Sequence, residues 1–475
     1  MFEDGRAASL IDQIGDASRA ESAAIARRLG AVGQLDALRT VELVECRLWR
    51  TDPYEEVAAE ISAAQNISRG RAAGQIHFAR VLRDELICVA EVFGTGAIDY
   101  RMVAAIINRT ENVEAHVKRE LDSALARHCT KWMRLSDKKL AERIDLWVAK
   151  HDPAAVRVPP KVKDNRYVEI IETSPGMAGI WASLDVADAA VFDATLDALA
   201  ATVCDNDPRT NDQRRSDALA PLARRESTLQ CRCGSPDCAS AAERKAVSDI
   251  VINVLAEQAT LEGANHPGYL PGFGILPAES VRDLADAGAT VKPVKMPTGA
   301  EPNYRASKSL SAFVQWRDLT CRFPGCDDPA EVCDVDHTKP HPYGPTHPSN
   351  TKLYCRTHHL VKTFYAGFGW QERQFPNGVV VWTAPTGHTY STEPHGGTLF
   401  PALAQPTGDL GDIFVPDESP NRGVMMPTRR QTREQDREER IARERRERKE
   451  LNKQVEREEA KRRKWLAANY EPPPF

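Results

Sequence analysis

Apolar residues between positions 7 and 150 recur at the three- and four-residue spacing that is typical of amphipathic helices. The pattern is clear at 38–44 and 76–86, and Gly and Pro are scarce inside these segments. Helix interiors tolerate these two residues poorly, so their scarcity supports the same assignment. We therefore predict a mainly helical N-terminal region.

One part of this region, residues 57–76, has the pattern of two helices separated by a short turn. Ser68 is the expected N-cap of the second helix, and Arg69 and Arg71 follow close behind it. Two interpretations remain open. The pair is either a helix-turn-helix that reads DNA or a plain helical hairpin packed in a core.

Beyond residue 155, short runs rich in β-branched residues alternate with Ala-rich segments. We therefore expect an α+β fold in which the helices are accompanied by a small mixed sheet. Strands are predicted at 156–158, 167–171, 177–182 and 249–254, and helices at 185–203 and around 214–219.

Gly and Pro are frequent at 263–304 and again after residue 396, and nearly every residue from 429 to 465 is charged or Gln. Such composition is typical of linkers and of solvated helices or disordered tails. The predicted division is an α+β domain at 1–262, a linker with one short helix at 263–304, a small domain at 305–395, and a mobile linker with a charged, helical or disordered tail at 396–475.

The composition of the 475 residues, 41% hydrophobic and 28% charged, is that of an ordinary globular protein. A net charge of -5 means that any contact with nucleic acid must come from a local basic patch. No apolar run approaches the roughly 20 residues of a membrane span, and the first residues lack the pattern of a signal peptide. We therefore expect a cytoplasmic protein without a membrane partner, whose clustered cysteines bind metal.

Two close pairs of potential metal ligands lie in the predicted small domain. Cys321 and Cys326 flank a turn, and Cys355 and His358 are three residues apart at the start of a predicted helix. Two such pairs are what a tetrahedral structural zinc site requires. Cys333 lies between the pairs and is an alternative ligand.

Three further cysteines, Cys231, Cys233 and Cys238, lie close together around Gly and Pro. They suggest a second zinc site, although three thiols leave it one ligand short. Cys204 or His266 would complete it only if the fold brought one of them close, and the sequence leaves this question open.

A second kind of metal chemistry is indicated by Asp336, His337 and His359. Neighbours in a strand point to opposite faces, so Asp336 would hold a divalent ion together with His359, while His337 acts as the general base on water. Such an open site suits Mg²⁺, Mn²⁺ or a softer divalent ion. Asn350 would fix the loop that holds His337 or supply a further ligand oxygen.

Two basic residues on the predicted helix, Arg356 and Lys362, are candidates for binding phosphate. His341 and His347 are interpreted as loop histidines without a role.

The order of these residues resembles the HNH, or ββα-metal, nuclease motif, in which two strands and a helix surround one catalytic metal. Asp336, His337, Asn350 and His359 match its metal ligand, general base, asparagine and last histidine. The resemblance implies a zinc-stapled HNH domain at 305–395, closed by a hairpin that turns at Asn377-Gly378.

The rest of the chain also resembles a known family. The helical N-terminal half, the 215–219 tract, the cysteines at 231–238 and the C-terminal motif together are similar to the actinobacterial domain-of-unknown-function family 222, also called the thirteen-E-twelve repeat family. The resemblance extends to about residue 395. Its members are often associated with mobile or repeated elements, and the charged tail is not part of the pattern.

From these observations we expect a metal-dependent endonuclease that hydrolyses phosphodiester bonds in DNA, with structural Zn²⁺ and a catalytic divalent ion. One alternative is a non-catalytic, zinc-containing protein that binds nucleic acid. The set Asp336, His337, Asn350 and His359 argues against it, because a pure binding module has no need of a general base. A third hypothesis is an RNA nuclease or a contact-dependent toxin domain.

Overall fold

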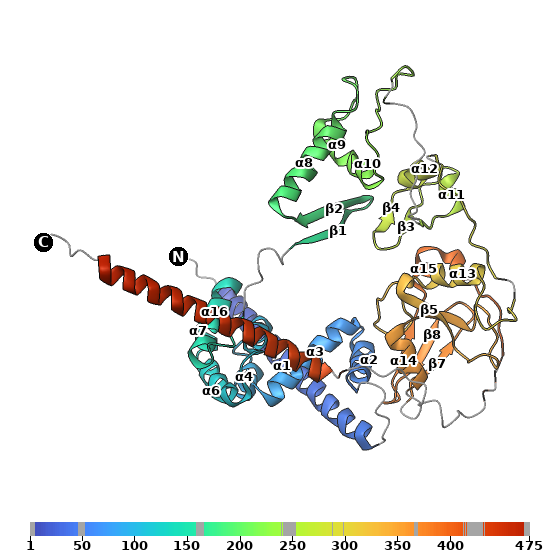
Figure 1. The fold of residues 1–475 in the computed structure, drawn as a ribbon. Coiled ribbons are helices and arrows are strands. Elements are labelled where there is room, and N and C mark those ends of the chain that lie inside the picture. The colour runs from blue at the N-terminus through green and yellow to red at the C-terminus, as the bar shows by residue number, and fades with distance from the viewer. Residues whose placement is uncertain are drawn as a thin grey trace. The chain divides into compact units, whose positions relative to one another are not determined.

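The computed structural model describes residues 5–45, 53–157, 166–238, 240, 253–286, 288–297, 299–364, 369–411, 413, 415, 431 and 433–469. The chain is an α+β protein that forms two compact units, coloured by residue number in Figure 1. The first unit combines Met1–Pro159 with Pro293–Phe475, and the second is Pro160–Lys292.

The N-terminal part of the first unit is helical, as predicted. Its core is a continuous set of buried apolar residues that includes Phe93, Ile106 and Leu125. Helix α5 shows why the sequence folds this way, because Asp99 caps it and its buried residues recur at helical spacing. The helices are α1 (Gly5–Glu45), α2 (Pro53–Gln65), α3 (Arg69–Asp84), α4 (Ile87–Gly94), α5 (Tyr100–Thr110), α6 (Ala115–Ala126), η1 (Cys129–Trp132) and α7 (Asp137–His151).

Helices α2 and α3 form the predicted helical pair. Ser68 is the N-cap of α3, and its side chain accepts a hydrogen bond from the backbone N–H of Arg71. The facing apolar side chains of the two helices share a buried core, which includes Ile61 and Ile76. Arg69 is paired with Glu55 of α2, its Nε lying 2.6 Å from the carboxylate oxygen Oε2. The pair is therefore a packed hairpin in which Arg69 already has an acidic partner.

The C-terminal part of the first unit contains an antiparallel β5–β6 pair followed by α14, and a three-stranded antiparallel sheet in the order β7-β8-β9. Gly378 lies in the turn between β7 and β8, where its φ is positive at 81°, and these two strands form the predicted hairpin. The elements are α13 (Lys308–Asp318), η3 (Ala330–Val332), β5 (Cys333–His337), β6 (Thr351–Cys355), α14 (Arg356–Phe364), β7 (Gln371–Gln374), β8 (Val380–Thr383), β9 (Thr389–Thr392), α15 (His395–Leu399) and η4 (Pro401–Ala404).

The two parts of the first unit share a core, which the predicted division of the chain did not include. Ala59 and Ala63 of α2 pack in the same buried cluster as Phe323, Trp370 and Trp382. Burial of apolar surface is non-directional, so the hydrophobic pattern of α2 indicated a buried face without indicating its partner. The structure accordingly places residues 1–159 with 293–475 rather than with 160–262.

The charged segment at the end of the chain forms one helix, α16 (Arg433–Asn469), which runs alongside the helical bundle in Figure 1. Its side chains are paired with charged residues of the bundle rather than only with water. The pairs include Arg433–Glu55, Arg437–Glu85, Arg437–Glu111, Arg440–Glu111, Arg445–Glu114, Arg445–Asp152 and Glu444–Arg157.

The segment before this helix was predicted to be a mobile linker from residue 396. The structure corrects its first part, because Phe400 and Leu403 are buried and Ser349 donates a hydrogen bond to the carbonyl of Gly408. Residues 416–430 lie outside the described part of the chain. Within the described residues, no helix combines the length and the apolar character that crossing a membrane would require.

The second unit contains the predicted hairpin, with β1 paired antiparallel to β2. The predicted linker contains its expected short helix, α12, and in addition a β3–β4 pair that was not predicted. Residues 156, 157, 253 and 254, predicted to be in strands, are not, and 158 and 249–252 lie outside the described residues. The elements are β1 (Tyr167–Ser174), β2 (Met177–Ser183), α8 (Val186–Ala200), α9 (Asn211–Asp217), α10 (Leu219–Ala223), α11 (Gln258–Leu261), β3 (Gly268–Leu270), β4 (Gly274–Leu276) and α12 (Ala278–Asp286).

Candidate metal centre

Four potential metal ligands meet where the β5–β6 pair joins helix α14. They are Cys321, Cys326, Cys355 and His358, and all four are buried. Their ligand atoms lie within 4.8 Å of one another, which suits a single bound ion. The first two come from the loop after α13, and the other two from the end of β6 and the first turn of α14. The structure therefore brings together the four residues that the sequence predicted.

A tight turn between the first two cysteines places their thiols on the same side. The backbone N–H of Cys326 donates to the carbonyl of Phe323 at 3.0 Å, and Gly325 has a positive φ of 79°. A Cβ atom on Gly325 would lie 2.6 Å from the carbonyl oxygen of Ser62 in α2, which is closer than any side chain tolerates. Glycine is thus required both by the backbone conformation and by the contact with α2.

The chemistry of the four groups fits a cation such as zinc. His358 Nδ1 lies 3.2 Å from the sulfur of Cys355 and 3.6 Å from that of Cys321, while the ring of Phe323 stacks on His358 at 4.1 Å. Burial raises the pKa of the Cys321 thiol, whereas the thiols of Cys321 and Cys326 lower the pKa of Cys355. A divalent ion would stabilise all these groups in the deprotonated form.

Cys333, the alternative ligand, is not part of this group. It starts β5 opposite Cys355, and its thiol donates to the carbonyl of Asp328 at 3.6 Å. Among the described residues, the four-ligand set is therefore the one expected from the spacing.

The residues predicted to hold a second, catalytic ion lie at the other end of β5. Asp336 Oδ1 is 3.3 Å from His359 Nε2, and both side chains remain partly exposed. Burial works against ionisation of Asp336, but His359 and the positive charges of Lys362 and Lys352 hold the pKa of this carboxyl below its usual range. The site is thus an ionised carboxylate facing an imidazole, with two lysines nearby.

His337 points to the opposite side of β5, as strand alternation requires. Its Nε2 is 2.9 Å from Thr346 Oγ1, and the hydroxyl of Thr346 donates to the carbonyl of Asn303 at 2.6 Å. The hydroxyl has one proton, which it donates to Asn303. It therefore accepts a hydrogen bond from His337, and the ring proton of His337 is on Nε2. Nδ1 then has a free lone pair. Burial lowers the pKa of His337, and the ring of Tyr304 stacks on it at 5.4 Å.

Asn350 fixes the loop that follows His337. Its Oδ1 accepts from the backbone N–H of Lys339 at 2.8 Å, and its Nδ2 donates to the carbonyls of Lys339 and Pro345 at 3.0 and 2.9 Å. Three hydrogen bonds to the backbone leave this amide well satisfied. These hydrogen bonds agree with the first of the two roles predicted for Asn350, which is to fix the loop after His337.

The two candidate phosphate-binding residues differ in their surroundings. Arg356 is exposed at the start of α14. Lys362 instead contacts the carboxylate of Asp336 and the carbonyl of His337, and its Nζ is 2.7 Å from Glu372 Oε1. The ammonium of Lys362 is therefore already paired in this structure.

The sequence analysis missed Glu372, a buried carboxylate on β7 beside the Asp336 site. It also pairs with Lys352 at 2.9 Å and accepts a hydrogen bond from the hydroxyl of Tyr354. Burial lowers the pKa of Lys352 to about 8, against the attraction of Glu372. A signal was present, because strand alternation puts Glu372 on the same face as the apolar Trp370.

Comparisons with known proteins relate the chain to one family model and to proteins of Mycobacterium tuberculosis. The family model described as "Domain of unknown function (DUF222)" matches residues 16–318. "Uncharacterized protein Rv3776" of Mycobacterium tuberculosis is 40% identical over 475 residues, which cover 94% of this chain and 91% of the relative. "Uncharacterized protein Rv2100" of the same organism is 40% identical over 471 residues, covering 90% and 85%. No solved structure matches. The chain thus belongs to the DUF222 family.

Proposed function

We propose that the chain is a metal-dependent HNH endonuclease that hydrolyses phosphodiester bonds in DNA, with β5, β6 and α14 as its ββα-metal module. The observation that carries this proposal is the meeting of Asp336 and His359 at 3.3 Å, with His337 next to Asp336 in β5. A module with only a structural zinc site at Cys321, Cys326, Cys355 and His358 would not require the carboxylate and imidazoles of this second site.

The donor set of the second site fits a hard or borderline divalent ion. Asp336 offers an ionised oxygen ligand and His359 an imidazole nitrogen, and partial exposure leaves room for water and a phosphate oxygen. A bound Mg²⁺ or Mn²⁺ would supply positive charge for the scissile phosphate and its leaving oxygen.

His337 would act as the general base. The Nε2–H of His337 donates a hydrogen bond to Thr346, so the lone pair that can accept a proton from an attacking water is the one on Nδ1. Burial lowers the pKa of His337 and favours the neutral ring that this role requires. Asn350 would contribute as a positioning residue, because it fixes the backbone after His337.

The experiment is plasmid nicking by the purified full chain in Mg²⁺, Mn²⁺ or EDTA. We expect the wild type to cut with metal and not with EDTA. His337→Ala should cut at least about 100-fold more slowly, since general base catalysis contributes roughly 10² to 10⁴ in rate. His388→Ala is the matched control. His388 is exposed between β8 and β9, and its side chain forms a hydrogen bond with the nearby Thr386 hydroxyl. Equal cutting by wild type and His337→Ala would refute the assigned base.

One observation favours the alternative of a non-catalytic module that binds nucleic acid. Lys362 contacts Asp336 and thus neutralises the carboxylate without a metal. If neither protein cuts in any metal, while zinc remains bound and the wild type retards DNA in a gel, the nuclease proposal fails and this alternative stands.

A further inference from the structure

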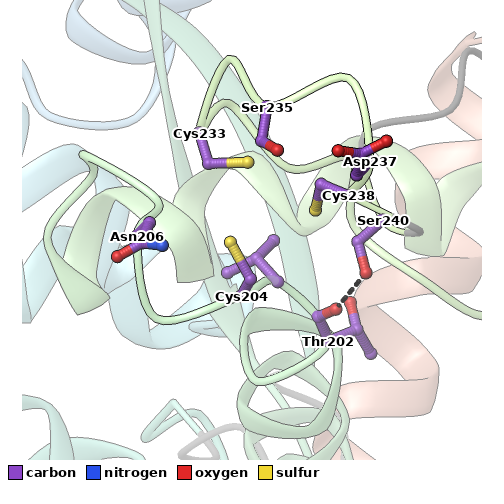
Figure 2. Close-up of a pocket in the computed structure, with 9 residues that line it drawn as sticks. Thr202, Cys204, Asn206, Cys233, Ser235, Asp237, Cys238 and Ser240 are labelled. Carbon is purple, nitrogen blue, oxygen red and sulfur yellow. Dashed lines mark hydrogen bonds between the residues drawn. The ribbon is translucent and has the colours of Figure 1, made fainter.

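A second group of potential metal ligands lies in the second unit, far from β5 and α14 in sequence. Figure 2 shows Cys204, Cys233 and Cys238 facing the same space, and Cys231 completes the set of four. We propose that these four thiolates bind one Zn²⁺ ion in a structural site that is independent of the nuclease proposal. Cys204 is the fourth ligand that the sequence left undecided, and His266 is not in the group.

The spacing of the four sulfur atoms fits one ion. They all lie within 4.8 Å of one another, and those of Cys204 and Cys231 are 3.5 Å apart. A disulfide would need about 2.05 Å, so these two thiols are not bonded. Zinc–sulfur bonds of about 2.3 Å in a tetrahedron place the sulfurs about 3.8 Å apart, close to the observed separation. An iron–sulfur cluster would hold them farther apart, because its own atoms lie between them.

The backbone around the site is held in place by groups other than the ligands. Asp207, buried just after Cys204, accepts hydrogen bonds from the side chain of Arg209 and from the backbone N–H of Arg232 at 2.8 Å. Arg209 in turn donates to the carbonyl of Gln230 at 2.7 Å. This buried ion pair joins the segment that carries Cys204 to the one that carries Cys231.

Two further hydrogen bonds link Thr202, just before Cys204, to the segments that carry Cys231 and Cys238. Thr202 Oγ1 accepts from the backbone N–H of Leu229 at 2.8 Å, and the Ser240 hydroxyl donates to the carbonyl of Thr202 at 2.8 Å. Such outer contacts orient metal ligands and are a regular feature of zinc sites. The four thiols therefore lie in a scaffold that keeps them together.

The local core is too small to hold this segment by apolar burial alone. The cluster around the thiols contains Val203 and Leu229 as its only buried residues besides Cys231 among those described. Segments with so little core are commonly stabilised by a metal or by disulfides. A zinc ion would supply that stabilisation, and four sulfur ligands favour zinc over Mg²⁺ or Ca²⁺, which prefer oxygen.

The test is the zinc content of the purified full chain, measured by mass spectrometry of the released metal. Cys204→Ser and Cys233→Ser should each contain about one zinc ion per chain less than the wild type. Cys88→Ser is the matched control, because Cys88 lies in α4 and outside both ligand groups, and it should keep the wild-type content. The difference between wild type and Cys204→Ser reports this site whether or not the chain cuts DNA. Unchanged zinc in both variants would overturn the proposal.

Cobalt gives a second readout that does not depend on the folding of those variants. Cys355→Ser removes one ligand of the first centre, in the first unit, and leaves the four-thiol group of the second unit intact. After exchange of zinc for Co²⁺, this chain should show strong sulfur-to-cobalt absorption in the near ultraviolet and the visible bands of tetrahedral cobalt. Absence of these bands in the Cys355→Ser chain would also overturn the proposal.

Discussion

Cys355→Ser should lose about one zinc ion per chain and unfold the part of the protein built around β5, β6 and α14. Cys355 is buried, and its sulfur lies 3.2 Å from His358 Nδ1 within the four-ligand group. Structural zinc contributes roughly 10–16 kcal/mol of apparent binding energy in small modules. The net stability of a domain is only about 5–15 kcal/mol, so the remaining interactions cannot compensate for the loss of the metal.

Zinc content and limited proteolysis of the full chain measure this effect. The matched control is Cys333→Ser, a nearby thiol that lies outside the ligand group and should keep the wild-type zinc content. If Cys333→Ser lost zinc and Cys355→Ser kept it, the ligand assignment would be reversed.

The second large effect is expected from Asp318→Ala, which should lower the free energy of unfolding by about 3–5 kcal/mol. Arg317 and Asp318 are both almost fully buried, and Arg317 Nε lies 2.8 Å from Asp318 Oδ1. Asp318 also accepts from the backbone N–H of Leu353 at 3.0 Å. The variant therefore leaves a buried guanidinium without its counter-charge and an N–H of β6 without its acceptor.

Urea denaturation followed by circular dichroism measures the loss. Asp334→Asn is a suitable control, because Asp334 is an exposed residue of β5 and its change should stay within about 0.5 kcal/mol. An Asp318→Ala chain as stable as this control would show that the buried pair is not a net stabiliser.

Local spacing was enough to predict the four-ligand centre. Cys321 and Cys326 flank one turn, and Cys355 and His358 lie one helical turn apart, so each pair is formed by its own segment. Strand alternation likewise predicted that Asp336 and His337 point to opposite sides, and the structure agrees. Predictions that depend on neighbouring residues succeed because local geometry sets their relative positions.

Other features required contacts between distant segments. Cys204 lies 27 residues before Cys231, and no local rule indicated that the chain would return to it. Glu372 of β7 reaches Lys352 and Lys362 only because β7 packs beside β6 and α14 in the fold. Pairing of this kind depends on the whole path of the chain.

The sequence by itself determined the α+β class, the helical N-terminal region, the β1–β2 hairpin, helices such as α8 and α12, and the two close pairs of ligands of the first centre. These follow from periodicity and spacing, which act over a few residues. Only the tertiary structure decided that α2 shares a core with Phe323 and Trp382, that α16 pairs with the carboxylates of the bundle, and that Cys204 completes the second group. Apolar burial and charge attraction are not specific to one partner, so the choice among many possible partners is made by the fold as a whole.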